Sequence, residues 1–353
     1  MADSFPESPL EFGMFDWIES SGPAPADIFD HKMRLVEAAD KAGFYAWHIA
    51  EHQGTPLSID GSPSVMVAAA IQRTKRLRMG ALTWCLPWQL PYRFYSEICM
   101  LDQMSRGRIE LGVGRGISPI ESKFMGVNSI DESRERYRET LDIFFEACRA
   151  DVLNWKGKFY EYKDLELYIK PVQKPCPPLW FPSSDRNSIE FIARHGYNTV
   201  LNQTVEEARR LYDHYRETWV KHRSDPGRHN AHVAAPKLGK TQLVFVADTD
   251  AEAEKAGLAA YATWVSHINY LTQKRGLPDL HPPVGPTTRQ SVTRVAVGSP
   301  KSVTQQLIEV VKTGNVNYLL LVFSFGDLRI EAAEHSMELF VKDVMPGVRA
   351  GAR

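Results

Sequence analysis

Short apolar segments that alternate with helical stretches along the whole chain constrain its fold more than any other sequence feature. The helical stretches repeat apolar residues at a spacing close to 3.6, as between Ile28 and Ala42. Asp27 is the expected N-cap of that helix and Gly43 its C-cap. The eight expected strands are Leu10–Phe15, Phe44–Ala50, Arg78–Trp84, Arg108–Val113, Leu179–Pro182, Tyr197–Leu201, Thr241–Val246 and Tyr318–Phe323.

Strands separated by helices predict a single (β/α)8 TIM barrel domain over residues 1–353. A doubly wound parallel sheet has the same alternation, so the periodicity leaves that fold open. Two segments exceed the usual length of a loop between a strand and a helix. We expect residues 154–178 to form a small β insertion, and the proline- and glycine-rich residues 273–293 to form a mobile lid.

Composition argues against several classes of function. The 42 basic and 43 acidic side chains give a net charge of −1, which offers no broad surface for nucleic acid or anionic lipid. Apolar runs such as Val65–Ile71 are far shorter than the roughly 20 residues of a membrane helix. The amino terminus is acidic and interrupted by proline, unlike a signal peptide, and the four cysteines lack CxxC spacing. We therefore expect a cytoplasmic protein with reduced thiols.

The residues that follow the strands are the candidates for an active site, because a barrel places its site at the carboxyl ends of its strands. His52 follows the second expected strand, and imidazole titrates near neutral pH, as a general base should. The alternative is an exposed loop histidine. Strand alternation turns His48 and His52 to the same side and Glu51 to the other. His48 lies in the middle of the strand, so we expect it to be a core histidine whose hydrogen bonds are satisfied.

Two further strand ends carry groups suited to a phosphate. Arg115 lies between Gly114 and Gly116, where the backbone permits close approach and the guanidinium can pair with phosphate oxygens. A surface ion pair is the alternative for this arginine. Ser184 and Asp185 lie where the fifth strand leads into a helix, whose first amides attract anions. A simple N-cap cluster explains these two residues equally well.

Aromatic residues also gather at the expected strand ends. Phe15, Trp17, Trp84 and Trp88 would wall a flat, mostly apolar pocket, unless they only pack in the core. The sequence has no HExxH, GxSxG or Walker motif and no carboxylate and histidine cluster with metal-ligand spacing. It therefore supports neither a metal mechanism nor a serine nucleophile.

The most specific stretch is Leu101–Arg108 (LDQMSRGR), followed by Gly112 and by Gly114–Gly116. Taken in order from about residue 10 to about residue 348, such features resemble the bacterial luciferase-like flavin monooxygenases, with a layout close to that of the luciferase alpha subunit. The supporting features are Gly43-Phe44, Ala50-Glu51-His52, Leu86-Pro87, Pro91, Gly298-Ser299-Pro300 and Asp343-Val344-Met345-Pro346.

The resemblance implies a barrel that binds FMN at the carboxyl ends of its strands. His52 matches the family's active-site histidine, and Arg115 matches the arginine that binds the flavin phosphate. Ser184 and Asp185 fall in the second phosphate-binding segment, where the luciferase version carries a different pair.

Other positions refine this expectation. Leu82-Thr83 lies where the family has a non-prolyl cis peptide under the flavin ring. Gln53 replaces a second histidine, and Gly114 stands where luciferase alpha chains carry a cysteine. These departures argue against light emission and a long-chain aldehyde substrate, but they leave oxygen activation by reduced flavin intact.

The activity implied by the resemblance is a two-component monooxygenation. A separate NAD(P)H:flavin reductase would supply reduced FMN, which reacts with O2 to give a C4a-(hydro)peroxyflavin that oxygenates a hydrophobic organic substrate. His52 would act as base or hydrogen-bond donor, while the tryptophans and the lid exclude water. The alternatives are a deazaflavin (F420)-dependent dehydrogenase on the same fold, and a non-catalytic flavin-binding partner like the luciferase beta chain.

Small residues at Val67–Ala70 allow close approach of helices, and family members dimerise through this region. We therefore expect a homodimer. Packing of these residues against their own barrel is the alternative.

Overall fold

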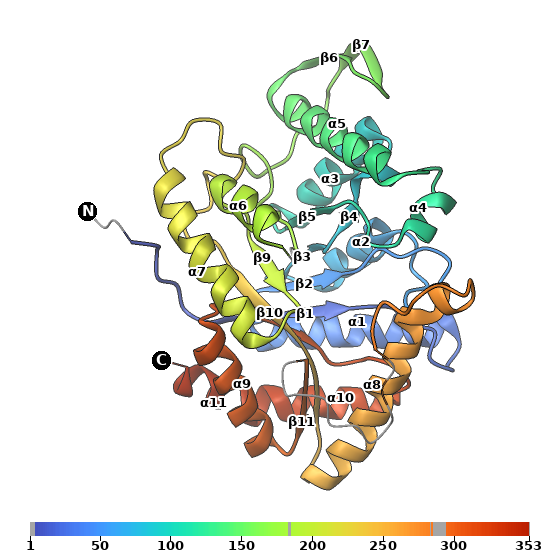
Figure 1. Ribbon diagram of the computed structural model, residues 1–353, viewed down its shortest axis with the longest axis vertical. Helices are drawn as coiled ribbons and strands as arrows, with labels where there is room; N and C mark the ends of the chain where they lie inside the picture. The colour runs from blue at the N-terminus through green and yellow to red at the C-terminus, as the bar shows by residue number, and fades with distance from the viewer. Residues whose placement is uncertain (1–3, 183–184, 283, 285–293, 353) are drawn as a thin grey trace.

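A ring of parallel strands lies at the centre of the computed structural model, which describes residues 4–182, 185–282, 284 and 294–352 (Figure 1). Within each of two sheets the strands of the ring pair in parallel with their neighbours along the chain, and the last strand of the ring pairs with the first. Bridges between Met79 and Ile109 and between Trp180 and Asn198 join the two sheets that form the ring. Its strands are β1 (Glu11–Asp16), β2 (Ala46–Ile49), β3 (Arg78–Ala81), β5 (Leu111–Gly114), β8 (Leu179–Trp180), β9 (Thr199–Leu201), β10 (Leu238–Val246) and β12 (Tyr318–Val322).

Helices surround the ring, as the predicted (β/α)8 barrel requires (Figure 1). They are α1 (Pro25–Ala42), α2 (Pro63–Arg73), η1 (Leu86–Trp88), α3 (Pro91–Ser105), α4 (Pro119–Phe124), α5 (Ile130–Arg149), α6 (Arg186–His195), α7 (Val205–His222), α8 (Asp250–Gln273), α9 (Pro300–Gly314), α10 (Ile330–Leu339), η2 (Phe340–Val344) and α11 (Met345–Gly351).

One of the two predicted caps of α1 agrees with the structure. Gly43 is its C-cap with φ 76°, a left-handed conformation that glycine adopts without a Cβ penalty, as predicted. The prediction of Asp27 as N-cap was wrong, because the helix already begins at Pro25 with Ala24 as N-cap. Proline suits the first helical position, since the N–H group that it lacks has no partner within the helix there.

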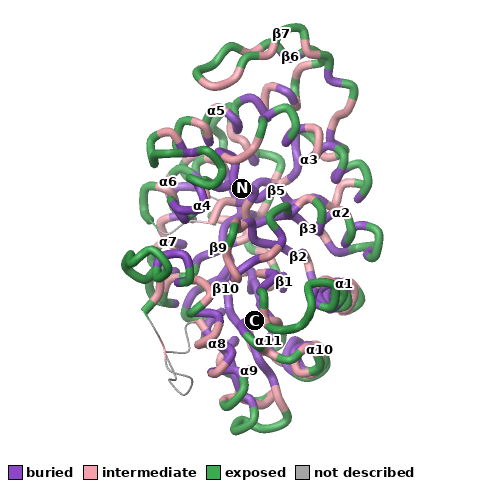
Figure 2. The backbone as a smooth tube through the Cα atoms, turned by 90° about the vertical axis from the view of Figure 1, so that its right-hand side faces the viewer, coloured by how far each residue is buried: buried purple, intermediate pink, exposed green. Residues whose placement is uncertain are grey.

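Side chains of each strand face the ring interior and the helix layer in turn. Phe12 and Met14 of β1 belong to the core beneath the helices, whereas Phe15 belongs to the separate core inside the ring. On β12, Leu319 faces outward and Leu320 inward in the same way. Buried residues therefore follow the strands, and exposed residues gather in the outer loops and on the outer faces of the helices (Figure 2).

Two strands were not predicted. β4 (Trp84–Cys85) pairs with the end of β5, and β11 (Val295–Gly298) pairs with residues 243–246 of β10. The first residues of β10, from Leu238 to Lys240, pair instead with β9. β10 is thus long enough to pair first with β9 and then with β11. β11 lies beside the carboxyl-terminal half of β10.

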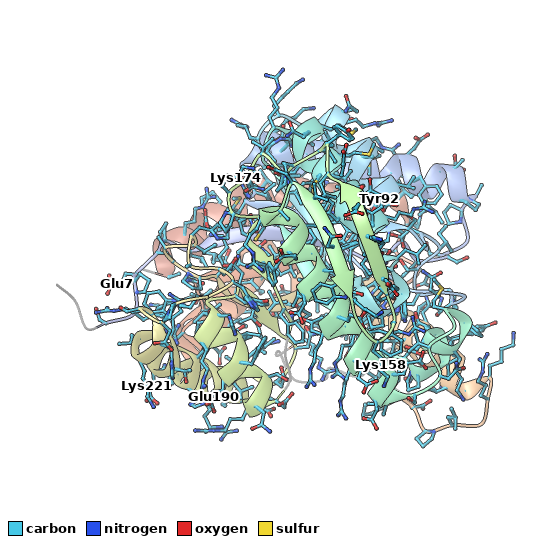
Figure 3. The ribbon with its side chains drawn as sticks, turned by 90° about the horizontal axis from the view of Figure 1, so that it is seen from above. Glu7, Tyr92, Lys158, Lys174, Glu190 and Lys221 are labelled. Carbon is cyan, nitrogen blue, oxygen red and sulfur yellow. The ribbon has the colours of Figure 1, made fainter. Side chains whose placement is uncertain are left out.

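An antiparallel hairpin follows α5 and stands outside the ring (Figure 3). It consists of β6 (Val152–Lys156) and β7 (Glu161–Glu166), so it overlaps residues 154–178 of the predicted insertion. The Glu139 carboxylate on α5 accepts hydrogen bonds from backbone amides of the hairpin turn, including Tyr160 at 3.0 Å. Figure 3 labels Lys158 in this turn and Tyr92, whose amide donates to the Tyr162 hydroxyl at 3.3 Å.

The segment predicted as a mobile lid, residues 273–293, lies partly outside the described residues, which omit 283 and 285–293. Its first part follows α8, where Asn269 fixes the backbone of His281. Within the described part of the chain, no helix has the length and apolar character needed to cross a membrane.

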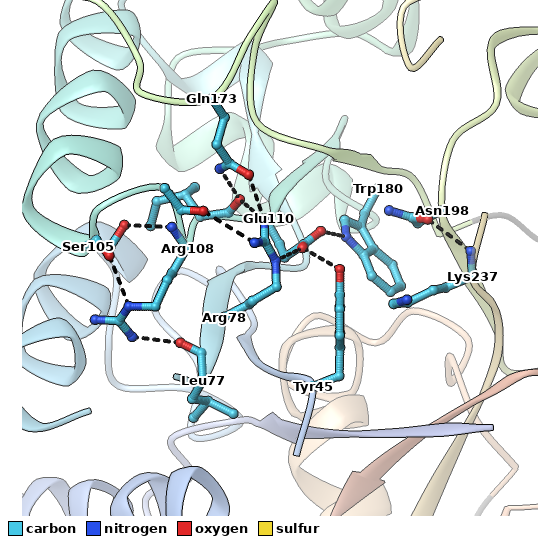
Figure 4. Close-up of polar contacts among 12 residues, drawn as sticks. Tyr45, Leu77, Arg78, Ser105, Arg108, Glu110, Gln173, Trp180, Asn198 and Lys237 are labelled. Atoms are coloured by element: carbon cyan, nitrogen blue, oxygen red, sulfur yellow. Dashed lines mark hydrogen bonds and ion pairs between the residues drawn. The ribbon is translucent and has the colours of Figure 1, made fainter. Parts of the chain in front are cut away.

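Glu110 is the centre of a polar network in the ring interior, at the end opposite the strand termini that carry the candidate residues (Figure 4). Its fully buried carboxylate accepts hydrogen bonds from the Tyr45 hydroxyl at 2.6 Å and from the Trp180 indole, and it forms an ion pair with Arg78. Arg78 also donates to the Gln173 side chain at 2.7 Å. The network satisfies polar groups that would be costly to bury alone.

We expect Glu110→Ala to lower the free energy of unfolding by about 3 kcal/mol, because it leaves the Arg78 charge buried without a counter-ion. Urea denaturation monitored by circular dichroism measures this loss. Glu97→Ala is the control, since it removes the exposed Arg93–Glu97 ion pair of 2.8 Å and should change stability by less than about 1 kcal/mol. Equal losses in the two variants would contradict the importance of the network.

Candidate active site

A cavity of about 460 Å³ opens at the carboxyl ends of the strands. This volume lies in the range of small-molecule sites, roughly 300–1,000 Å³. Its wall comes from the segments that follow β1, β2, β3, β5, β8 and β9, and from β10 and α8. Of the predicted site residues, Phe15, Trp17, His52, Leu82, Thr83, Trp88, Gly114, Arg115 and Asp185 line it.

His52 is held by a carboxylate that the sequence analysis did not identify. Its Nδ1 lies 3.1 Å from a carboxylate oxygen of Glu121, which also accepts a hydrogen bond from the Gln53 amide at 2.8 Å. Glu121 is buried, and its own amide donates to Ser118 at the start of α4. Because a carboxylate only accepts hydrogen bonds, Nδ1 carries the proton and Nε2 is the basic nitrogen.

Glu51 lies in the cavity wall beside His52, contrary to the prediction that alternation turns it away. β2 ends at Ile49, so the alternation of an extended strand no longer applies to these two residues. The Glu51 carboxyl accepts hydrogen bonds from the Cys85 amide at 2.6 Å and from the Gln89 side chain at 3.1 Å. Burial raises the pKa of Glu51 to about 8, so this wall residue is a neutral acid at pH 7.

His48 is buried as expected, with its ring centroid 4.8 Å from that of Trp180, but the expectation that its hydrogen bonds are satisfied was wrong. Neither ring nitrogen has a hydrogen-bond partner within the part of the chain that the structure describes. Burial lowers the pKa of His48 to about 4, which keeps its imidazole neutral.

Arg115 and Asp185 lie at the mouth of the cavity, after β5 and β8. Arg115 is exposed, and its guanidinium has no hydrogen-bond or ion-pair partner among the described residues. Asp185 is the N-cap of α6, and it accepts hydrogen bonds from the Ser188 hydroxyl at 2.7 Å and from the Ser188 amide at 3.0 Å, which lower the pKa of its carboxyl. Ser184 lies outside the described residues.

The floor of the cavity includes Leu82 and Thr83, whose peptide bond is cis, as the resemblance implies. Gly114 packs directly on this segment, since a Cβ atom there would lie 2.2 Å from the Thr83 hydroxyl. Only glycine permits this approach, which leaves a smooth floor without a projecting side chain from the end of β5.

Aromatic side chains form the opposite wall, but not all of them were predicted. The ring centroid of Trp17 lies 4.7 Å from that of Phe15 and 5.2 Å from that of Trp264 on α8. The placement of Trp84 in the pocket was wrong. It is buried beneath the helices against Phe94 and is absent from the described cavity lining, because alternation on β4 turns it outward.

Sequence reasoning missed Glu121, Trp264, His281 and Arg294, which also line the cavity. Ser118 and Glu121 match the S-x-x-E capping pattern, which predicts a helix start but not a contact with His52. Trp264 lies within α8 and Arg294 immediately before β11, so a search limited to residues after each strand does not reach them.

The cavity has the groups needed for a flat ring with an anionic tail. Arg115 supplies positive charge at its mouth, beside the N-terminus of α6, which the Asp185 carboxylate caps. The smooth floor at Gly114 and the apolar side chains of Leu82 and Leu243 suit the face of a planar ring.

Comparison with known proteins identifies the family. Residues 10–316 match the family described as luciferase-like monooxygenase. An uncharacterised protein of Sinorhizobium fredii is 32% identical over 97% of this chain and 98% of its own length. The oxygenase component of a flavin-dependent trigonelline monooxygenase from Acinetobacter baylyi is 26% identical, over 70% of this chain and 68% of that protein.

Solved structures give the same fold at lower identity. The oxygenating constituent of 3,6-diketocamphane monooxygenase from Pseudomonas putida, in complex with FMN, has a TM-score of 0.77 at 20% identity and covers 96% of this chain and 98% of its own. The coenzyme F420-dependent tetrahydromethanopterin reductase of Methanopyrus kandleri has a TM-score of 0.70 at 15% identity and covers 96% and 99%. The family match covers most of this chain, and the Sinorhizobium fredii protein is 32% identical over nearly its whole length. Both findings show that the chain belongs to the luciferase-like monooxygenase family.

Proposed function

We propose that this chain is the oxygenase component of a two-component flavin monooxygenase. It would use reduced FMN from an NAD(P)H:flavin reductase, together with O2, to oxygenate a hydrophobic organic substrate, and both proteins would be cytoplasmic. The observation that carries the proposal is that His52 and Arg115 line one cavity, with the floor at Leu82–Thr83 in the same wall. The names of the related oxygenase components agree with it.

The positive groups at the cavity mouth support binding of FMN by its phosphate. Arg115 can form paired hydrogen bonds with phosphate oxygens, and the first amides of α6 add positive potential near Asp185. When bound in its reduced form, flavin supplies the electrons that activate O2. The protein contributes the position of the ring on the floor at Gly114 and a wall that excludes water.

His52 is the acid–base group of this proposal. Glu121 holds its Nδ1–H, so Nε2 is free to accept a proton from a reacting group in the cavity and to return it. The neighbouring Glu51 is neutral at pH 7 and therefore does not compete with His52 for that proton. Phe15, Trp17 and Trp264 offer the apolar surface that a hydrophobic substrate needs.

A dehydrogenase that uses F420 is the second candidate, because the solved neighbours with this fold include an F420-dependent reductase. A non-catalytic flavin-binding partner is the third. Titration of the apoprotein with FMN and with F420 separates the first two, and a binding-only protein would consume no O2 when reduced FMN and a reductase are supplied.

We also propose a homodimer formed through α2 and α3. Val67 and Ala70 are buried against their own barrel, so these two small residues are used inside the protomer. Exposed apolar side chains nevertheless remain on the outer faces, namely Val65 on α2 and Met100 and Met104 on α3. Light scattering is expected to give twice the chain mass of 40.0 kDa, and a particle of the chain mass would contradict the proposal.

Arg115→Gln is expected to weaken FMN binding about 10- to 100-fold, because it removes a charge-assisted contact to the phosphate. Fluorescence titration of the apoprotein with FMN measures the dissociation constant. Binding of riboflavin, which lacks the phosphate, should be the same in the variant and the wild-type protein. An unchanged FMN affinity would place the phosphate elsewhere.

His52→Ala is expected to bind FMN normally but to lower the rate of oxygenation about 10²- to 10⁴-fold, the usual contribution of a general acid–base group. The electrons from reduced FMN should then be recovered as hydrogen peroxide, which a peroxidase-coupled assay measures beside product yield. His335→Ala is the control, since this histidine of α10 is half-exposed and is not in the described cavity lining. Full product yield from His52→Ala would exclude the assigned role.

A further inference from the structure

Arg294 is a second cation in the cavity wall, and the proposed flavin site does not use it. It lies immediately before β11, beside α8, whereas Arg115 follows β5 in another sector of the ring (Figure 1). Its Nη1 lies 2.6 Å from Nδ1 of His281, and it hydrogen-bonds to Tyr261. Among the residues that the structure describes, no carboxylate forms an ion pair with it.

The two hydrogen-bond partners of Arg294, His281 and Tyr261, carry no charge. Burial, and then the charge of Arg294, lowers the pKa of His281 to about 4. Burial raises the pKa of the Tyr261 hydroxyl above its ordinary value, so this phenol also carries no charge. Burial, and then Arg294, lowers the pKa of the nearby Lys240 to about 7. In contrast, the buried Lys32 is paired with Asp16 at 2.6 Å, so the chain does neutralise cations elsewhere.

A half-buried cation without a counter-ion stabilises an anion that enters beside it, because the cation is already partly removed from water and the attraction between the two charges is less screened there. The guanidinium of arginine suits a carboxylate in particular, since its parallel N–H groups match the two oxygens. Arg294 therefore supplies the charged end of a ligand site within the cavity.

The apolar end of this site is a row of aromatic rings that begins next to Arg294. The ring centroid of Trp264 lies 5.5 Å from that of His281 and 5.2 Å from that of Trp17. Ile268 and Leu271 of α8 extend the same wall. A planar apolar body placed along these rings would have its anionic group at Arg294.

The position of His281 is fixed before any ligand binds. The buried side chain of Asn269 accepts a hydrogen bond from the His281 amide at 2.9 Å and donates one to its carbonyl at 2.7 Å. α8 thus holds the imidazole that contacts Arg294, which lowers the cost of ordering the site on binding.

We propose that the substrate of this cavity is an organic carboxylate with a flat apolar body, which pairs its carboxylate with Arg294 and lays its body along Trp264 and Trp17. This inference rests on the proposed function, because it assigns the Arg115 end of the same cavity to the flavin phosphate. It narrows the substrate from any hydrophobic compound to a ring acid or a similar anion.

Binding of two matched probes to the apoprotein tests the inference without activity. 2-Naphthoate carries the carboxylate, and 2-naphthamide has the same ring without charge. Quenching of tryptophan fluorescence, checked by calorimetry, gives both dissociation constants. We expect naphthoate to bind at least about 10-fold more tightly than naphthamide to the wild-type protein.

Arg294→Gln is expected to weaken naphthoate about 10- to 100-fold and to leave naphthamide unchanged. Arg294→Lys, which keeps the charge, should lose less affinity than Arg294→Gln. The FMN affinity of each variant serves as the folding control and is expected to remain that of the wild-type protein. Arg115→Gln is the matched control, which should lose FMN affinity and retain naphthoate.

The two proposals fail in different ways. If the wild-type protein does not bind FMN, the proposed function fails while the naphthoate measurements still stand. Loss of FMN rather than naphthoate in Arg294→Gln would assign Arg294 to the cofactor phosphate and overturn the inference. Equal affinity of the wild-type protein for naphthoate and naphthamide, or no binding of either, would overturn it as well.

Discussion

A closed ring of parallel strands allows each strand residue only two environments, the ring interior and the layer beneath the helices. In this protein the interior is divided along its length. Glu110 and its hydrogen-bond partners fill one end, while Gly114 and Ala50 leave the other end open as the cavity. At the filled end, Glu110 accepts hydrogen bonds from Tyr45, Arg78 and Trp180, which link the segments of four neighbouring strands.

Glu121 connects two of the loops that this ring brings together. It contacts His52 and the Gln53 amide after β2, and it belongs to the segment that carries Arg115 after β5. A single buried carboxylate therefore sets the proton position on the imidazole and ties its loop to the segment bearing the exposed guanidinium. The same part of the chain therefore positions both the His52 imidazole and the Arg115 guanidinium.

The alternation of apolar segments and helices predicted a parallel sheet covered by helices, because that pattern follows from burial on both faces of such a sheet. It left a doubly wound sheet open, and the resemblance to the flavin monooxygenases favoured the barrel. β11 was missed because it is short and follows a long polar stretch. Side-chain direction was predicted poorly where strands end. Glu51 and Trp84 both face the other way, since the chain leaves the extended conformation or begins a new short strand there. Contacts such as Arg294 with His281 depend on how α8 packs, which local sequence does not encode.

Gly114 and Cys85 together determine whether the cavity wall presents a thiol that an oxidant can modify. The luciferase alpha chains that the sequence resembles carry a thiol at the position of Gly114, where this chain has no room for a side chain. Cys85 is the one cysteine in the described lining, and burial, followed by the Glu51 carboxyl, raises its thiol pKa well above the usual value. Because the thiolate is the nucleophile that attacks a peroxide, a wall thiol that stays protonated is slow to form sulfenic acid. A peroxide formed in this cavity would thus leave the Cys85 thiol of the cavity wall unoxidised over many turnovers.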